Sequence, residues 1–515
     1  MKKSLHILLP ALCLLLAARE AAAQWYLFPG MRQHRDTTRQ ESFLPPEDDR
    51  DAADTLQVSV ILPLRSDGTP SSNFLQFYTG VLAAADSLAA GGTAIALYVH
   101  DAARENAVLP VRQLAQSDLV IGPVGVPEMR RCTEYCPNQY FISPLEPKAA
   151  ELTDSCRVVQ APAAYDDQLD ELVRWLLEDW QAGDRLVFLQ NGQEAVQEAS
   201  LRFQERLTEA GLIFSEAPDP SEFLAVAGGC TRYVLPASAE EYCANAVREI
   251  ALERMRGLDV VLYGTSRLRS SGNVEEESLR QADARITASY AVEKGNAAMQ
   301  AFSERYLRRF KAEPGSFALQ GYDVTYYFIS LYRQYGPGWF NQLPFCPGTG
   351  LQSDFRFLDV PTTGQANRAV RRVRYRAGTE EEPERLREEL RQEASAPDSV
   401  SVFDKFSHRL IITQEPEVRK ALEQHVFNNA MRMAQGLEDQ CFCIRIYFDN
   451  SQNAREKSMQ EANRFKALFP GIPVLRNFSA SFFKVTVGEY NSRAEAQAAL
   501  KRIKNSFPSA FIVRK

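Results

Sequence analysis

The C-terminal stretch Cys443-Ile444-Arg445-Ile446-Tyr447-Phe448 alternates in the manner of a half-buried strand. Ile444, Ile446 and Phe448 would point to one side of a sheet, and Arg445 and Tyr447 to the other. The chain continues with a helical pattern, two strand patterns, a second helix and a last strand, over residues 452–468, 474–478, 483–487, 492–503 and 511–513. The spacing therefore predicts a small α+β domain over residues 441–515 with the element order βαββαβ.

The two helices of this domain can cover only one face of its four-stranded sheet, so the other face is expected to stay in contact with water. The alternation assigns four polar or aromatic side chains to that face: Arg445, Tyr447, Lys484 and Thr486. Hydrogen-bond donors, cations and an aromatic ring suit a polar, ring-containing ligand such as a glycan. The alternative is a solvated sheet face that binds nothing.

Charge is distributed unevenly along the chain. Residues 441–515 contain 13 Lys or Arg against 5 Asp or Glu, which is a net charge of +8. Because the whole chain carries −7, the remaining residues sum to −15. A basic domain on an acidic body indicates an anionic or polar surface as the partner of the C-terminus.

Two segments of this domain resemble the internally repeated pattern of SPOR domains, which are small envelope modules that bind peptidoglycan glycan strands. The first segment is Phe442–Phe448 followed by Asn453-Ala454, and the second is Phe483–Tyr490 followed by Ser492–Ala496. The resemblance covers about 75 residues and implies that peptidoglycan glycan strands are the partner of the domain.

The N-terminus has the pattern of an export signal. Lys2-Lys3 precede an apolar run over residues 5–18, and Ala21-Ala22-Ala23 provides small residues for cleavage after Ala23. The apolar run is shorter than the roughly 18 to 20 residues that a spanning helix needs, and an uncleaved anchor is the alternative. We therefore expect a periplasmic or cell-envelope protein that does not span the membrane and does not bind nucleic acid. Residues 24–54 are polar and predict a flexible tail.

Residues 55–376 alternate between strand and helix patterns, and several of the strands are apolar almost throughout. Such repetition predicts an α/β fold with parallel sheets covered on both faces, and the length indicates two lobes. Residues 377–400 are rich in Glu and Arg and predict a charged linker. Residues 401–440 predict a helical lead-in, with a short strand and a helix that packs beside the C-terminal domain.

The order of elements in the body resembles that of type 1 periplasmic binding proteins, the fold of branched-chain amino-acid receptors. The similar residues include Gly80, Asp101, Ile121-Gly122-Pro123 and Gly321-Tyr322-Asp323. In such folds ligands bind beyond the carboxyl ends of the strands, and five residues are expected there: Ser66, Gly125, Ser143, Tyr263 and Tyr290. The family's usual Ser after Gly-Pro is absent, so a scaffold for protein contacts is the alternative to a small-molecule site.

One catalytic pattern, S-x-x-K, is matched at Ser481–Lys484, but it lies at a predicted strand where no helix can place the lysine beside the serine. The other catalytic motifs and paired metal-ligand spacings are absent from the sequence, so we expect no enzyme, no cofactor and no metal. Eight cysteines follow the predicted cleavage site, and an exported chain can form disulfides. The candidate pairs are Cys132 with Cys136 or Cys156, and Cys230 with Cys243.

The sequence thus predicts a non-enzymatic envelope protein that binds peptidoglycan and acts in cell-wall organisation or division. Its further partner would be a cell-wall synthesis or division protein. The alternative hypothesis is a solute-binding receptor of an ABC transporter, specific for an amino acid or a small metabolite.

Overall fold

The computed structural model describes residues 55–105, 107–191, 197–222, 229–236, 240–269, 274–292, 296–376, 401–434, 442–449, 454–479, 482–490, 493–508 and 510–514. The predicted signal peptide, the tail over residues 24–54 and the linker over residues 377–400 lie outside these ranges. No helix in the described ranges is both long enough and apolar enough to span a membrane.

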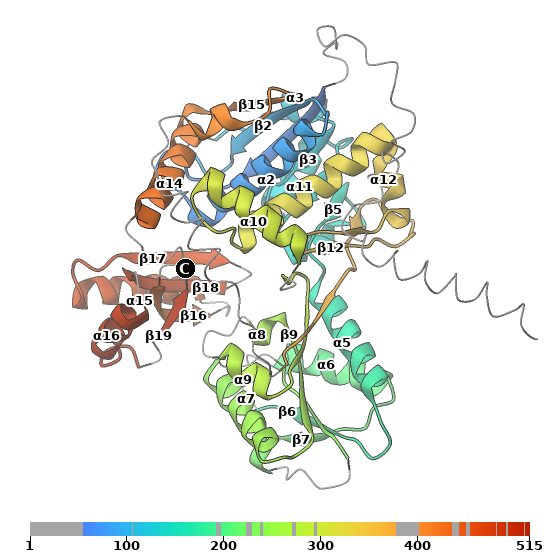
Figure 1. Ribbon diagram of the computed structural model, residues 1–515, viewed down its shortest axis with the longest axis vertical. Helices are drawn as coiled ribbons and strands as arrows, with labels where there is room; N and C mark the ends of the chain where they lie inside the picture. Colours follow the sequence, from blue (N-terminus) through green and yellow to red (C-terminus); the bar gives the residue numbers. More distant parts are fainter. Residues whose placement is uncertain are drawn as a thin grey trace, which may run out of the picture.

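The first lobe contains a seven-stranded parallel sheet (Figure 1). Its strands, in sheet order, are β13 (Gln365–Ala366), β5 (Val158–Gln160), β4 (Phe141–Ser143), β3 (Leu119–Ile121), β1 (Leu56–Leu62), β2 (Ile95–Asp101) and β15 (Leu410–Gln414). The central strands are buried almost throughout because helices cover both faces, and this explains their continuous apolar sequences.

Helices flank this sheet and build most of the apolar core of the first lobe. They are α2 (Ser72–Ala90), α3 (Val111–Gln116), α4 (Val126–Tyr135), α10 (Ala297–Phe310), α11 (Ser316–Tyr335), α12 (Trp339–Gln342) and α14 (Pro416–Ala434). Short 3₁₀ helices and a small hairpin complete the lobe: η3 (Pro147–Leu152), η6 (Gly336–Gly338), η7 (Leu343–Phe345), η8 (Val402–Lys405), β11 (Gly348–Thr349) and β12 (Asp354–Phe355). Helices α2 and α11 lie against each other, and their backbones approach closely at two glycines: Gly80 faces the backbone of Ala318, and Gly321 faces the backbone of Phe77.

The second lobe contains a six-stranded sheet, parallel except at one edge. In sheet order its strands are β14 (Arg371–Arg374), β10 (Arg285–Ala288), β9 (Val260–Thr265), β8 (Thr231–Val234), β6 (Arg185–Leu189) and β7 (Ser215–Ala217). The helices of this lobe are α5 (Tyr165–Asp179), α6 (Gln197–Glu209), η5 (Pro220–Glu222), α7 (Glu240–Met255), α8 (Ser266–Arg269) and α9 (Glu276–Gln281).

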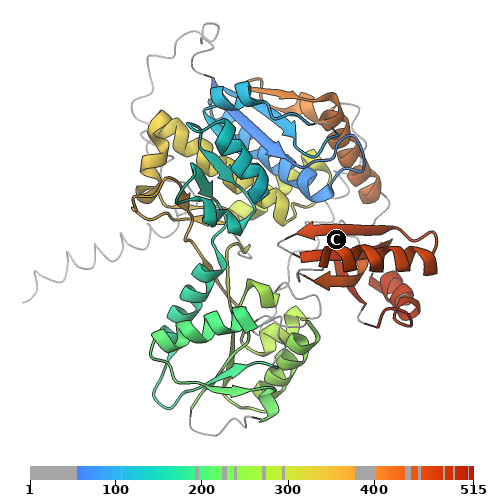
Figure 2. The ribbon, with the colours of Figure 1, turned by 180° about the vertical axis from the view of Figure 1, so that it is seen from behind.

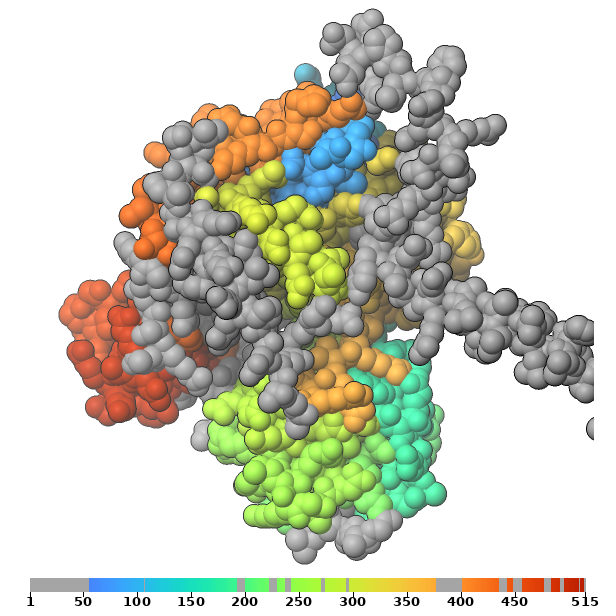
Figure 3. Space-filling model, in the orientation of Figure 1, coloured from blue at the N-terminus to red at the C-terminus, as the bar shows by residue number. Residues whose placement is uncertain are grey.

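The chain passes between the lobes repeatedly. It leaves the first lobe after β5, returns between β10 and α10, and leaves again between β13 and β14. Figure 1 and Figure 2 show the two lobes joined by these segments, with the C-terminal unit to one side. In the space-filling view, orange residues near β14 lie among the green residues of the second lobe (Figure 3). The two-lobed α/β body that the sequence predicts is confirmed.

Residues 401–434 belong to the first lobe, and this corrects the prediction that they pack beside the C-terminal domain. Strand β15 pairs in parallel with β2 at the edge of the sheet, and Leu410, Val418 and Leu422 are buried in the first-lobe core. The charged segment 377–400 therefore connects β14 of the second lobe to the first lobe, and does not join the body to the C-terminal unit. Sequence reasoning missed this because a five-residue edge strand carries no sign of which sheet it joins.

The C-terminal unit has the predicted βαββαβ order. An antiparallel sheet is formed by β17 (Val474–Ser479), β18 (Phe482–Tyr490), β16 (Phe442–Asp449) and β19 (Phe511–Arg514), in that sheet order. Helices α15 (Ala454–Leu468) and α16 (Arg493–Ile503) both cover the face that presents Ile444 and Val485. Phe465 and Ile503 of the two helices are buried in the same apolar cluster, so this small domain has its own core.

Candidate functional site

The helix-free face of the C-terminal sheet presents one row of side chains that crosses all four strands. Arg445 pairs with Thr486 on one side and with Phe511 on the other, and Thr486 pairs with Leu475 of the edge strand. The neighbouring residues Ile444 and Val487 point to the opposite, helix-covered face, as the period of two requires. We call Phe511, Arg445, Thr486 and Leu475 the sheet row.

Arg445 lies at the centre of the sheet row and is held on an aromatic ring. Its guanidinium carbon is 4.6 Å from the centroid of the Phe511 ring, and the residue is only 7% exposed. Thr486 and Lys484 are half-buried, whereas Leu475 is 41% exposed. The expectation of a fully solvated face is therefore wrong for Arg445, whose side chain is packed in place on Phe511.

Tyr447 does not share this face with Arg445. The pairing of β16 with β18 shifts register between Arg445 and Tyr447, so Tyr447 lies opposite Val485. Tyr447 consequently packs against the helix-covered apolar cluster. A β-bulge inserts one extra residue into a strand and reverses the alternation beyond it. This corrects the predicted position of Tyr447, because the alternation alone contains no sign of the bulge.

Three of the predicted interlobe residues lie at the carboxyl edge of the first-lobe sheet. Ser66 follows β1, and its N–H and hydroxyl both donate to Asp101 Oδ2 at 2.7 Å. Gly125 is the N-cap of α4, and Ser143 is the last residue of β4 and fully buried. The sequence therefore predicted the location of these residues. The Ser66 hydroxyl, which was expected to face a ligand, donates its hydrogen to Asp101 instead.

Tyr263 is not an interlobe residue, contrary to the prediction. Its side chain is fully buried inside the second lobe, where its hydroxyl accepts from Arg232 at 2.7 Å and donates to Asp179 at 2.8 Å. Arg285 contacts the same hydroxyl and Asp179. Burial raises the pKa of Tyr263 above its ordinary value. The residue thus joins a buried charge network, and strand position alone cannot distinguish this role from a role at the carboxyl edge.

We predict that Tyr263→Phe lowers the free energy of unfolding by about 1–3 kcal/mol, because it removes the hydroxyl that accepts from Arg232 and donates to Asp179 inside the buried network. Chemical denaturation of the full chain, followed by circular dichroism, measures the change. Tyr290→Phe is the matched control, since Tyr290 is 38% exposed, and should change stability by less than about 0.5 kcal/mol. Equal stability of Tyr263→Phe and the wild type would contradict the prediction.

Tyr290 lies where the sequence places it, beyond the carboxyl end of β10. It forms an isolated antiparallel bridge with Ser353, and the Arg269 guanidinium carbon is 5.8 Å from its ring centroid. Two further residues at this edge, Tyr165 and Arg267, were missed. The Arg267 guanidinium carbon lies 3.7 Å from the Tyr165 ring centroid. Their separation by about 100 residues in the sequence hides this contact.

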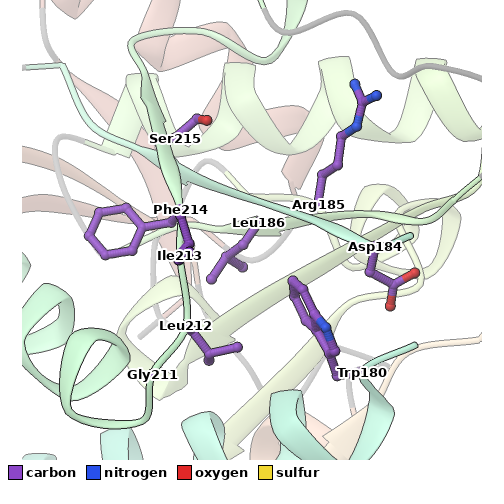
Figure 4. A pocket seen from close by; sticks show the side chains of 9 residues that line it. All are labelled: Trp180, Asp184, Arg185, Leu186, Gly211, Leu212, Ile213, Phe214 and Ser215. Carbon is purple, nitrogen blue, oxygen red and sulfur yellow. The ribbon is translucent and has the colours of Figure 1, made fainter. Parts of the chain in front are cut away.

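A cavity of about 550 Å³ lies at the opposite edge of the second-lobe sheet (Figure 4). Its lining comes from the end of α5 and from the amino ends of β6 and β7: Trp180, Asp184, Arg185, Leu186, Gly211, Leu212, Ile213, Phe214 and Ser215. Because the strands are parallel, this edge is remote from Tyr290 and Arg267. The cavity is therefore separate from the predicted interlobe site.

Two histidines of the body, one in β2 and one in α14, are partly buried. Burial lowers the pKa of both His100 and His425 to about 4, so both imidazoles are neutral at pH 7. Within the described ranges, no three His, Cys, Asp or Glu side chains gather in a way that could hold a metal ion.

The predicted disulfides are not formed. Cys132, Cys136, Cys156, Cys230 and Cys243 are not joined to one another by disulfide bonds. Cys230 and Cys243 belong to different apolar clusters of the second lobe. Burial raises the pKa of the Cys132 thiol to about 12, which keeps it protonated and weakly nucleophilic.

Comparison with known proteins assigns the class of the C-terminal unit. Residues 443–514 match the family model of the SPOR domain, which confirms the resemblance predicted for this region. No curated protein matches the chain.

Solved structures match over the body of the chain. One is described as a branched-chain amino acid ABC transporter from Rhodospirillum rubrum, with 15% identity over 63% of this chain and 99% of that chain and a TM-score of 0.46. A second is an ABC transporter substrate-binding protein from Desulfitobacterium hafniense in complex with leucine. It is 14% identical over 63% of this chain and 98% of that chain, with a TM-score of 0.40. A third is full-length LpoA from Haemophilus influenzae, which is 13% identical over 63% of this chain and 58% of that chain, with a TM-score of 0.41.

Proposed function

We propose that this chain is an exported cell-envelope protein whose SPOR domain binds peptidoglycan glycan strands and so holds the two-lobed body at the cell wall. The observation that carries the proposal is a basic domain with one face free of helices, matched to the SPOR family. On that face the sheet row combines a half-buried hydroxyl and a half-buried aromatic ring, which are groups that contact sugars by hydrogen bonding and stacking, and the Arg445 guanidinium is packed between them with 7% exposure.

The body, in this proposal, comprises residues 55–376 together with 401–434 and contacts a cell-wall synthesis or division protein. Its use as a scaffold without catalytic activity is supported by the structural roles of its titratable groups. Asp101 orders the loop that carries Ser66, and Tyr263 belongs to a buried network. A receptor for a small solute is the second candidate, and the arginines at the carboxyl edge of the second lobe favour it for anionic solutes.

Co-sedimentation of the full chain with purified peptidoglycan sacculi tests the wall-binding proposal. We expect Arg445→Gln to reduce the bound fraction about tenfold, because it removes the cation held at the centre of the sheet row. Arg464→Gln is the matched control: Arg464 also lies on a phenylalanine ring, 5.0 Å from Phe507, but on the helical side of the domain. The control should bind like the wild type.

Two measurements complete this test. Thermal unfolding of each variant establishes that the domain remains folded, and sacculi treated with an amidase show whether stem peptides affect binding. Absence of wild-type binding to either preparation would overturn the proposal. Equal losses in Arg445→Gln and Arg464→Gln would show that general basicity, and not the sheet row, supplies the affinity.

A further inference from the structure

Two arginines lie at the carboxyl edge of the second-lobe sheet, and each rests on a tyrosine ring. Both belong to α8, which follows β9 directly and which Figure 1 shows at the end of the second lobe that faces the first lobe. Arg267 stacks on Tyr165 with 3.7 Å between guanidinium carbon and ring centroid. Arg269 lies 5.8 Å from the Tyr290 ring centroid and donates from Nη2 to the Tyr290 carbonyl oxygen at 3.0 Å.

Most described arginines of the second lobe form an ion pair with a carboxylate, and these two do not. Across the described ranges of the chain, neither Arg267 nor Arg269 has a carboxylate within 4.0 Å. The nearby Asp166 is already paired with Arg202 at 3.5 Å. Within the part of the chain that the structure describes, no carboxylate therefore forms an ion pair with either of these cations, and the charge of each remains available to an anion.

Stacking gives these cations a defined orientation. A guanidinium that lies flat on a ring keeps its N–H groups in its own plane, where they remain available to an acceptor at the edge. Arg267 is exposed, so its outward N–H groups can reach a ligand. A planar fork of donors fits the two oxygens of a carboxylate or of a phosphate.

We propose that Arg267 and Arg269, held on Tyr165 and Tyr290, form a binding site for an oxyanion, carboxylate or phosphate, on a ligand of the two-lobed body. The site uses residues from α5, α8 and the segment after β10, which meet only in the folded lobe. It lies in the body and does not depend on sugar binding by the SPOR domain, so the two proposals can fail separately.

Isothermal titration calorimetry of the full chain with succinate and with inorganic phosphate tests this site, and succinamide serves as the uncharged counterpart of succinate. We expect at least one anion to bind, succinamide not to bind, and Arg267→Gln/Arg269→Gln to weaken anion binding at least tenfold. Arg248→Gln is the matched control, because Arg248 is an exposed second-lobe arginine whose side chain donates to Asn245. The tighter of the two anions identifies the class of oxyanion.

Replacement of the supporting ring separates orientation from charge. Tyr165→Leu keeps both cations but removes the surface on which Arg267 lies, and it should weaken anion binding several-fold. Tyr165→Phe keeps the ring and should bind like the wild type. The proposal is overturned if the wild type binds neither anion, if the double variant binds as tightly as the wild type, or if Arg248→Gln loses as much affinity as the double variant.

Discussion

Gly321→Ala is expected to lower the free energy of unfolding by about 3 kcal/mol or more, although alanine is the better helix former by about 1 kcal/mol. Gly321 lies in α11 where this helix crosses α2. A Cβ atom there would come within 2.1 Å of the Phe77 carbonyl oxygen and 3.2 Å of the Val81 nitrogen. Both obstacles are backbone atoms of a helix, so they cannot rotate away as a side chain would. The clash therefore outweighs the gain in helix propensity.

Chemical denaturation of the purified full chain measures this effect. Gly338→Ala is the control, since no atom lies within 4 Å of a Cβ built at that position and its φ is −82°. Gly80→Ala should behave like Gly321→Ala, because its Cβ would meet the Ala318 carbonyl oxygen at 1.9 Å. A Gly321→Ala protein as stable as the wild type would show that the two helices can separate without cost.

Asp323→Asn is the second change for which we expect a large loss of stability, about 2–4 kcal/mol. The buried carboxylate of Asp323 accepts the N–H of Leu351 at 2.7 Å on Oδ1, and those of Gln352 and Ser353 at 2.8 and 2.9 Å on Oδ2. An asparagine retains one acceptor oxygen and turns an NH₂ donor toward the remaining N–H. At least one buried donor is then left without a partner.

This carboxylate matters for the connection between the lobes. It holds the loop over residues 350–353, and Arg371 donates to the Gly350 carbonyl of that loop at 2.8 Å. Arg371 also reaches the Ala291 carbonyl at 2.6 Å, on the segment that returns from the second lobe. Loss of Asp323 should therefore loosen the interlobe connections as well as the first-lobe core.

The pH dependence of stability distinguishes the loss of this carboxyl from a general packing defect. Burial raises the pKa of Asp323 to about 6 from its ordinary value near 4, so the folded chain holds this proton more tightly than the unfolded chain. The part of the stability that comes from this tighter proton binding is therefore fully present below about pH 4 and is lost as the pH rises through 6, whereas the hydrogen bonds to the carboxylate do not depend on that proton. The stability difference between the wild type and Asp323→Asn should shrink over that range. Asp154→Asn, which removes an exposed carboxylate, is the control for the change from Asp to Asn itself.

The short motifs in the body turn out to have structural roles. Gly80 and Gly321 allow α2 and α11 to touch, Asp323 holds a loop at the crossing between lobes, and Asp101 holds the loop after β1. The sequence predicted the positions of these residues within the fold. Their contacts could not be predicted. Each contact joins residues that are far apart in the chain, or depends on two backbones coming close together, and the spacing of residues in the sequence shows neither.

Hydrophobic period and strand–helix order by themselves determined the two-lobed α/β body, the βαββαβ order of the C-terminal domain and the exclusion of helices from one of its faces. These features follow from which side chains must be buried, and the sequence shows for each residue whether its side chain is apolar or polar. Only the tertiary structure decided that β15 joins the first-lobe sheet, that a bulge turns Tyr447 into the core, that Tyr263 joins a buried network and that Arg267 meets Tyr165. Those outcomes depend on strand register and on contacts between distant segments, which exist only once the chain has folded.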